Sequence, residues 1–195
     1  MRNLISLMHV SLDGFVAGPN GEIDWAAARG DDELWETLTP ILSTVDSAIF
    51  GRVTYHLFLD YWPTAATNPS SSRNDVAFAH WIESVAKTVI SKSLEKVEWK
   101  NTELIAKNID GEIAKKKQQP GKNLLVFGSP SLTTTLINLN LMDEFRIFVH
   151  PVFLGKGKPF LQSLKARHEV KLMASKGLRS GVVALRYGNS GRTAP

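Results

Sequence analysis

Three short segments of this sequence combine glycine, hydroxyl and cationic side chains in the manner of phosphate-binding turns. Glycine lets an anion approach the backbone, free helical N–H groups and the helix dipole attract it, and an arginine can donate to two phosphate oxygens at once. The segments are Gly51-Arg52-Val53-Thr54, Ser91-Lys92-Ser93 and Gly128-Ser129-Pro130-Ser131. Taken alone, each is equally well explained as a helix cap or a turn, so its meaning depends on where it lies.

Each segment lies at the end of a short apolar run that we expect to be a β-strand. Ligands of open α/β sheets bind at the carboxyl ends of such strands. Ser129 is expected to cap the helix that follows the last run, with Pro130 at its first position. Three such termini in one domain favour a shared polyphosphate ligand over three unrelated caps. The runs are Ser47–Phe50, Thr88–Ser91 and Leu124–Phe127.

Carboxylates that could orient a substrate, or relay a proton to it through water, lie in two places. Asp13 follows the first predicted strand in a turn, and Asp32 belongs to the acidic group Asp31-Asp32-Glu33 at the start of a predicted helix. Turn chemistry and the helix dipole explain these residues without any function. Asp13 and Asp32 are nevertheless the candidate catalytic residues.

The sequence contains no cysteine, which excludes a disulfide framework, a thiolate metal site and a cysteine nucleophile. This composition fits a reducing, cytoplasmic compartment. The five histidines show no metal-ligand spacing, and His9 is expected to be a satisfied core residue. No metal site is predicted, so redox chemistry here would require a bound organic cofactor.

An α/β sheet covered by helices on both faces must position these residues, because short apolar runs alternate with longer segments of helical period. Two further strands are expected at Leu4–Val10 and Glu103–Ala106. Pro40 should kink or divide the first helix. The predicted helices are Asp32–Val45, Asn74–Val85 and Ser131–Leu139.

After Leu141 the pattern changes to strands separated only by loops, which predicts an antiparallel end to a mixed, mainly parallel sheet. These strands are expected at Phe145–Val149, Val170–Met173 and Val182–Tyr187. A single domain over residues 1–187 accounts for the pattern, with the polar segment 188–195 as a frayed tail.

The net charge of +4 comes from scattered lysines and arginines, without the basic stripe typical of nucleic-acid binding. The run Lys115-Lys116-Lys117 is expected on the solvated face of a polar helix. No apolar stretch approaches the roughly 18 residues of a membrane span. We therefore expect neither a nucleic-acid nor a membrane partner, and nucleic-acid binding ranks third among the hypotheses.

In their order along the chain, the motifs Ser-Leu-Asp-Gly, Gly-Arg-x-Thr, Ser-Lys-Ser and Gly-Ser-x-x-Leu resemble the dihydrofolate reductase superfamily. The segments Leu141–Ile147 and His150–Phe160 are similar to a stretch typical of its riboflavin-biosynthesis branch, the RibD C-terminal reductase domain. The resemblance spans about Leu4 to Tyr187. It implies a three-layer α-β-α fold and an NADPH-dependent reductase.

The resemblance also implies how NADPH is held. The first two segments would bind the adenosine phosphates, the third would line the pyrophosphate, and two backbone groups would pair with the nicotinamide carboxamide. Gly18–Trp25 matches the mobile active-site loop, and Trp25 and Glu33 are assigned to the substrate. The cofactor-binding set is Val10, Ala17, Gly51, Arg52, Thr54, Ser91, Lys92, Gly128, Ser129 and Ser131.

The glycine run usual after the fifth strand of true dihydrofolate reductases is replaced here by Gly128-Ser129-Pro130, which favours the riboflavin-type branch. The expected reaction is hydride transfer to a pyrimidine-ribosylamino compound of the riboflavin-pathway type, or to a related heterocycle. One alternative is a dihydrofolate reductase proper. Another is a non-catalytic NADP-binding regulatory module, since the deaminase partner of riboflavin enzymes is missing. Because relatives commonly dimerise, a homodimer is expected.

Overall fold

A single eight-stranded sheet forms the centre of the computed structural model, which describes residues 1–26 and 31–190. The strand order is β5-β4-β3-β6-β1-β7-β10-β9. A separate two-stranded ladder joins β2 (Phe15–Ala17) to β8 (Lys158–Pro159). The strands of the large sheet are β1 (Leu4–Ser11), β3 (Val45–Gly51), β4 (Ala86–Ile90), β5 (Thr102–Ile105), β6 (Asn123–Phe127), β7 (Glu144–His150), β9 (Val170–Gly177) and β10 (Val183–Asn189).

The first six strands of that order are parallel to one another. β1 pairs in parallel with both β6 and β7, and β3 does so with both β4 and β6. β10 runs antiparallel to both β7 and β9. The carboxyl ends of the parallel strands therefore meet at one edge of the sheet. The predicted mixed, mainly parallel sheet with an antiparallel C-terminal end is confirmed.

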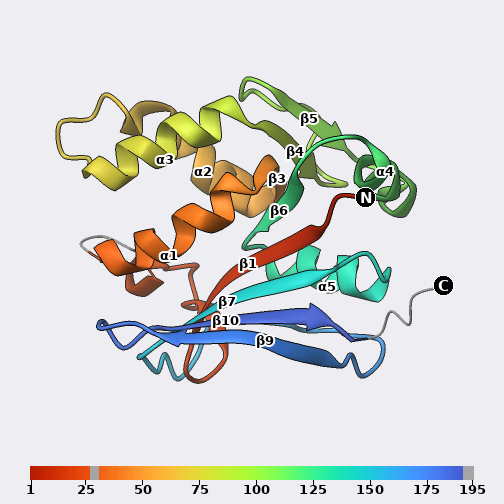
Figure 1. Cartoon of the computed structure of the whole chain (residues 1–195). Helices are drawn as coiled ribbons and strands as arrows, with labels where there is room; N and C mark the ends of the chain where they lie inside the picture. The colour runs from red at the N-terminus through yellow and green to blue at the C-terminus, as the bar shows by residue number, and fades with distance from the viewer. Residues whose placement is uncertain (27–30, 191–195) are drawn as a thin grey trace.

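Helices cover both faces of the sheet (Figure 1). One apolar core lies between the sheet and α1 (Asp32–Ser43), α2 (Arg52–Ala65) and α3 (Arg73–Ser84). A second core lies on the other face, against α4 (Ile109–Gln118) and α5 (Pro130–Asn138). A single 3-10 turn, η1 (Asp24–Ala26), precedes α1. No helix of the described ranges has the length and hydrophobicity needed to cross a membrane.

The helix α1 shows how the sequence specifies these layers. Its buried residues, Leu34, Leu38, Ile41 and Leu42, recur at the spacing of one helical face. Asp31 begins the helix by accepting a hydrogen bond from the backbone N–H of Leu34 at 2.9 Å. Pro40 does not divide the helix, which continues to Ser43. Proline removes only its own N–H bond, and packing of the apolar face compensates for that loss.

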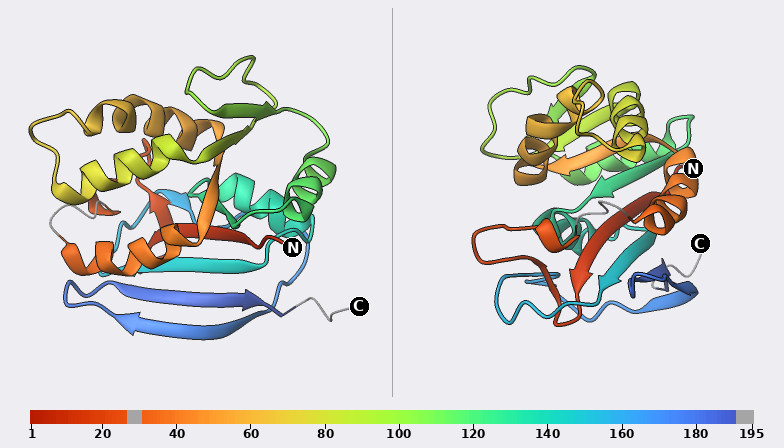
Figure 2. Two further views of the ribbon diagram at one scale, coloured as in Figure 1. Left: turned by 45° about the horizontal axis from the view of Figure 1, so that its top comes forward. Right: turned by 90° about the vertical axis from the view of Figure 1, so that its left-hand side faces the viewer.

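The C-terminal strands are longer than predicted and form the edge of the sheet farthest from α2 and α3 (Figure 2). β10 continues through Gly188 and Asn189, which pair with Lys171 and Val170 of β9, so these two residues are not part of a frayed tail. Residues 191–195 of that tail lie outside the described residues. Every residue of β9 is exposed, including the side chain of Leu172.

Lys117 corrects the prediction that the whole lysine run is solvated. Lys115 is exposed, but Lys117 is only 2% exposed. Its ammonium donates to the carbonyl of Leu141 at 2.8 Å and to the carboxylate of Asp143 at 2.5 Å. Asp143 in turn accepts a hydrogen bond from the backbone N–H of Leu4. The buried pair thus joins α4 to the starts of β1 and β7.

We predict that Lys117→Ala lowers the free energy of unfolding by about 3 kcal/mol, because it removes a buried ammonium that binds both the Asp143 carboxylate and the Leu141 carbonyl. Lys115→Ala, on the same helix, should change it by less than about 0.5 kcal/mol. Urea unfolding followed by circular dichroism measures both variants. Equal effects of the two substitutions would contradict a structural role for the pair.

Candidate functional site

The first and third predicted phosphate segments are in contact at the carboxyl edge of the sheet. Their strands, β3 and β6, are neighbours in the sheet. A Cβ atom on Gly51 would overlap the hydroxyl of Ser129, and one on Gly128 would lie 3.6 Å from the Thr54 hydroxyl. Glycine at position 51 therefore lets the turn after β6 pack against the start of α2, and the starts of α2 and α5 lie close together.

Neither of these two helices has a side-chain cap at its N-terminus. Gly51 precedes α2 and offers no side chain, and Ser129 precedes α5 with its hydroxyl making no cap bond. Ser129 occupies the predicted N-cap position, with Pro130 as the first residue of α5, but the expected side-chain cap is not made, and the Ser129 backbone is left-handed, with φ 53° and ψ 76°. Among the residues that the structure describes, the first N–H groups of both helices are thus without side-chain acceptors, an arrangement that can bind anions at helix N-termini.

Two cations flank these helix starts. Arg52 is the first residue of α2 and is exposed, and within residues 1–26 and 31–190 it forms no ion pair. Lys92 is also exposed and follows β4, the strand next to β3. Ser91 is buried, and its hydroxyl accepts hydrogen bonds from the backbone N–H groups of Ser93 and Leu94. Ser91 therefore shapes the turn that carries Lys92.

Two of the other predicted cofactor residues lie on α5 and β1, and the third lies in the separate ladder of β2 and β8. Ser131 is exposed on the first turn of α5. Val10 is buried near the end of β1, which lies beside β6 in the sheet. Ala17 is buried at the end of β2, and a Cβ on Gly157 would overlap its carbonyl oxygen. The loop after β7 therefore packs closely against the backbone of Ala17.

Asp13 holds together the two loops beside the end of β1. Its carboxylate accepts hydrogen bonds from the Ser11 hydroxyl at 2.6 Å, from Leu154 N–H at 3.0 Å and from Gly155 N–H at 2.7 Å. The hydrogen bond from Ser11, with those from Gly155 and Leu154, lowers the pKa of Asp13. The geometry gives Asp13 a clear structural role, while its catalytic role stays a prediction.

The three acidic residues at the start of α1, Asp31, Asp32 and Glu33, bind different partners and do not form one site. Asp31 caps the helix, whereas Asp32 is exposed and accepts a hydrogen bond from the Asn74 side chain of α3 at 2.9 Å. Glu33 accepts from the backbone N–H of Arg179 at 2.8 Å and thereby binds the turn between β9 and β10. That hydrogen bond is the main cause of the lowered pKa of Glu33.

Sequence reasoning missed a histidine pair at the carboxyl ends of β1 and β7. His9 Nδ1 and His150 Nε2 are 2.8 Å apart, although 141 positions separate the two residues along the chain. His9 stacks on Phe148, and the ring of Trp25 meets His150 edge-on with centroids 5.4 Å apart. Only the parallel pairing of β1 with β7 brings the two histidines together, so neither local spacing nor periodicity revealed them.

Burial keeps both imidazoles uncharged. Desolvation, with a smaller contribution from His150, lowers the pKa of His9 from 6.5 to about 3. Desolvation also lowers the pKa of His150, and the negative charge of Asp31 partly opposes this effect. The pair is therefore a neutral hydrogen-bonded unit with one proton in its shared bond.

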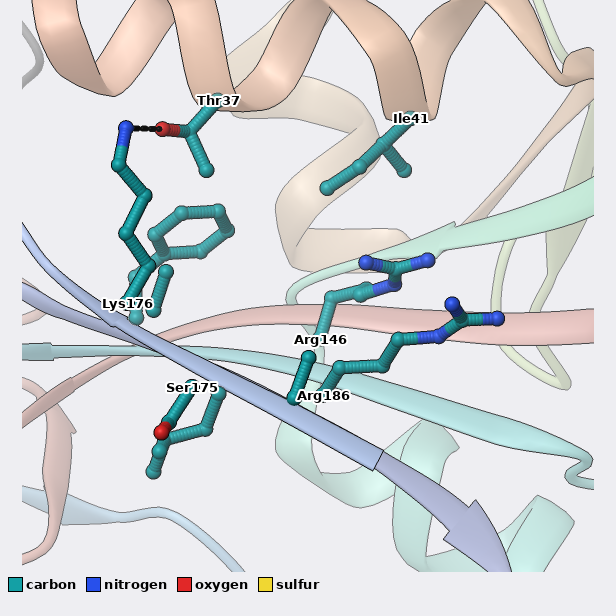
Figure 3. Close-up of a pocket in the computed structure, with 10 residues that line it drawn as sticks. Thr37, Ile41, Arg146, Ser175, Lys176 and Arg186 are labelled. Carbon is teal, nitrogen blue, oxygen red and sulfur yellow. Dashed lines mark hydrogen bonds between the residues drawn. The ribbon is translucent and has the colours of Figure 1, made fainter. Parts of the chain in front are cut away.

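A pocket of about 120 Å³ lies away from this edge, between α1 and the strands β7, β9 and β10 (Figure 3). Lys176 points from β9 toward Thr37 of α1 at one end, and the guanidinium groups of Arg146 and Arg186 lie near each other at the other end. Both guanidinium groups bind the buried carboxylate of Glu144. The pocket is smaller than the roughly 300 Å³ or more of most ligand sites, and its cations are already paired.

The α/β fold is similar to that of dihydrofolate reductase and of a riboflavin biosynthesis protein. Dihydrofolate reductase from Enterococcus faecalis, in a complex with NADP(H), superimposes with a TM-score of 0.62 at 11% identity, covering 96% of each chain. A putative riboflavin biosynthesis protein from Shewanella sp. PV-4 gives a TM-score of 0.73 at 20% identity, covering 96% of this chain and 99% of that one.

The chain belongs to the RibD C-terminal domain family, whose model matches residues 2–184. It is also 36% identical over 186 residues to the uncharacterized protein YyaP of Bacillus subtilis, covering 95% of this chain and 94% of that protein. The resemblance seen in the ordered motifs is thereby confirmed at the level of the family.

The lowered pKa of His9 predicts a loss of stability in mild acid. The unfolded chain takes up a proton at this site below pH 6.5, whereas the folded protein does not until near pH 3. Stability from His9 is thus fully present above pH 6.5 and is lost as the pH falls. We expect the free energy of unfolding to drop by about 1 to 2 kcal/mol between pH 7 and pH 5.

Urea titrations at several pH values measure how steeply the free energy of unfolding changes with pH. His9→Asn should flatten this slope, whereas His80→Asn, which changes an exposed histidine of α3, should leave it as in the wild type. An unchanged slope in His9→Asn would show that the pKa of His9 does not differ between the folded and the unfolded protein. The range from pH 5 to pH 7 also lies above the titration of ordinary carboxylates.

Proposed function

We propose that this protein is a reductase that uses NADPH to reduce a pyrimidine-ribosylamino compound or a related heterocycle. The observation that carries the proposal is the junction of α2 and α5 at the carboxyl edge of the sheet. Two uncapped helix N-termini meet there, and Arg52 and Lys92 stand on neighbouring strand ends. Membership of the RibD C-terminal domain family supports the same activity.

The residues at this edge fit the phosphates of a dinucleotide. Gly51 lets the Ser129 hydroxyl pack against the start of α2, which brings the two helix starts together, and among the described residues the N-terminal N–H groups of α2 and α5 have no side-chain acceptors. Arg52 and Lys92 would hold the adenosine phosphates, with the hydroxyl of Thr54 as a further donor. Ser129 and Ser131 would line the pyrophosphate.

The bound cofactor would extend from these strands toward β1. The backbones of Val10 and Ala17 would hold its carboxamide, and the cofactor would supply a hydride to the substrate. Asp13 would hold the loops around that position in place, through its bonds to Leu154 and Gly155. Trp25, packed on His150, would shield the substrate from water.

We predict that Arg52→Ala weakens the binding of NADPH by about 10- to 100-fold, because charge-assisted hydrogen bonds to the 2′-phosphate are lost. The binding of NADH, which lacks that phosphate, should change much less. The control is Arg73→Ala, which removes another exposed arginine at the first position of a helix. Calorimetric titration of both cofactors measures the effect, and equal losses for NADPH and NADH would contradict the phosphate role.

A stopped assay of NADPH oxidation against pyrimidine and pterin substrates tests the activity. We expect the wild-type protein to oxidise NADPH with a ribosylamino-pyrimidine and to leave dihydrofolate unreduced. Turnover of dihydrofolate alone would identify a dihydrofolate reductase instead. Tight binding of NADPH without its oxidation by any of these compounds would identify a non-catalytic NADP-binding module.

A further inference from the structure

The histidine pair lies beside the proposed cofactor site and is part of no phosphate contact. The phosphate-binding strand ends are those of β4, β3 and β6, and the next two strands in the sheet are β1 and β7, which carry His9 and His150. Neighbouring strands are about 5 Å apart, so the pair lies within about 5 to 10 Å of β6 across the sheet. A group bound next to the end of β1 would thus meet His9.

The two rings differ in their surroundings. His150 is 5% exposed and lies against Trp25, and the negative charge of Asp31 acts to raise its pKa. His9 is less buried, stacks on Phe148 and stands on the strand nearer the cofactor edge. In the part of the chain that the structure describes, neither His9 Nε2 nor His150 Nδ1 forms a hydrogen bond to another residue. The pair thus shares one hydrogen bond, and its two outer nitrogens are His9 Nε2 and His150 Nδ1.

A hydrogen bond between two neutral imidazoles can carry a proton without creating a buried charge. Each neutral ring has one N–H donor and one acceptor nitrogen, and the shared bond fixes the tautomer of one ring by that of the other. If a proton leaves one outer nitrogen, the shared proton can cross the bond while the opposite outer nitrogen takes up a replacement. Both rings are neutral before and after the transfer.

We propose that His9 and His150 form the proton relay of this reductase, with His9 as the catalytic acid. This inference rests on the proposed function. As hydride from the nicotinamide ring reaches the electrophilic carbon, His9 Nε2–H gives its proton to the adjacent heteroatom of the substrate. His9 Nδ1 takes the proton of His150 Nε2, and His150 Nδ1 takes one from water. The substrate gains one hydride and one proton, and NADPH becomes NADP⁺.

His150 acts through His9 and is a positioning residue. The negative charge of Asp31, which raises the pKa of His150 against the effect of burial, favours uptake of the replacement proton by the His150 ring. The exposed Asp32, bound to Asn74, points to α3 and is not required for this step. The relay therefore assigns proton transfer to residues on two parallel strands, which are more rigid than the loops beside them.

Two substitutions separate a relay from a structural hydrogen bond. In His9→Asn the amide replaces the Nδ1 side of the ring, and in His150→Gln it replaces the Nε2 side, so each variant keeps a partner in the shared bond and loses the outer nitrogen. His80→Asn is the matched control on the exposed face of α3. Thermal unfolding and calorimetric binding of NADPH show that each variant is folded and loaded.

We expect both variants to bind NADPH as the wild type does and to lose about 100-fold or more in kcat, the usual contribution of a general acid. In mixtures of light and heavy water, the wild-type kcat should fall along a curved line, because more than one proton moves together. The control should retain both properties. A kcat within about threefold of the wild type in either variant, or a linear dependence on deuterium content, would overturn the relay.

These results also separate the relay from the proposed function. Failure of the wild-type protein to oxidise NADPH with any heterocyclic substrate would refute the reductase activity, and the relay with it. Turnover by the wild type that survives both histidine substitutions would refute the relay alone and leave the reductase activity standing.

Discussion

The parallel pairing of β1 with strands on both of its sides is the constraint on which the candidate site depends. Because β6 and β7 flank β1 and run in its direction, their carboxyl ends meet at one edge. The parallel pairing of β3 with β6 continues the same alignment and places the turn after β6 next to the start of α2, whereas the pairing of β1 with β7 brings His9 beside His150. The histidine pair would not exist if β7 paired in the opposite direction.

Polar groups at this edge fall into two classes. The acidic residues have protein partners: Asp13 binds the loop after β7, Asp32 binds α3, and Glu33 binds the turn between β9 and β10. The helix starts at Gly51 and Ser129 have no side-chain acceptors, and Arg52 and Lys92 are exposed. Within residues 1–26 and 31–190 these three carboxylates thus have protein partners while Arg52 and Lys92 form no ion pair, a charge arrangement that favours an anion.

Much of the fold was predictable because its signals are local. The apolar spacing of α1 predicted its buried face, and glycine at the ends of β3 and β6 marked the turns that we propose to bind phosphate. The conformation of Ser129 was not predictable, since its left-handed backbone depends on packing against Gly51. Lys117 was misplaced because burial of its ammonium depends on Asp143, which comes from a distant strand.

The part of the site that we propose for the cofactor could be read from the sequence, and the histidine pair could not. The glycine, hydroxyl and cationic motifs are contiguous, so Arg52, Lys92 and Ser129 were candidates from the sequence alone. The histidine pair depends on the register of β1 against β7, in which Ser11 faces His150, and no short motif encodes it. Family membership adds the fold and the cofactor edge, while the choice of substrate depends on residues outside those motifs.

The central claim is that one dinucleotide binds across the ends of β4, β3 and β6. Titration of the isotope-labelled protein with NADPH, followed through its backbone amide NMR signals, tests it most directly. The account predicts that the amides of Arg52, Lys92 and Ser131 shift together, with one dissociation constant. Signals that shift with different constants, or shifts confined to other parts of the protein, would contradict it.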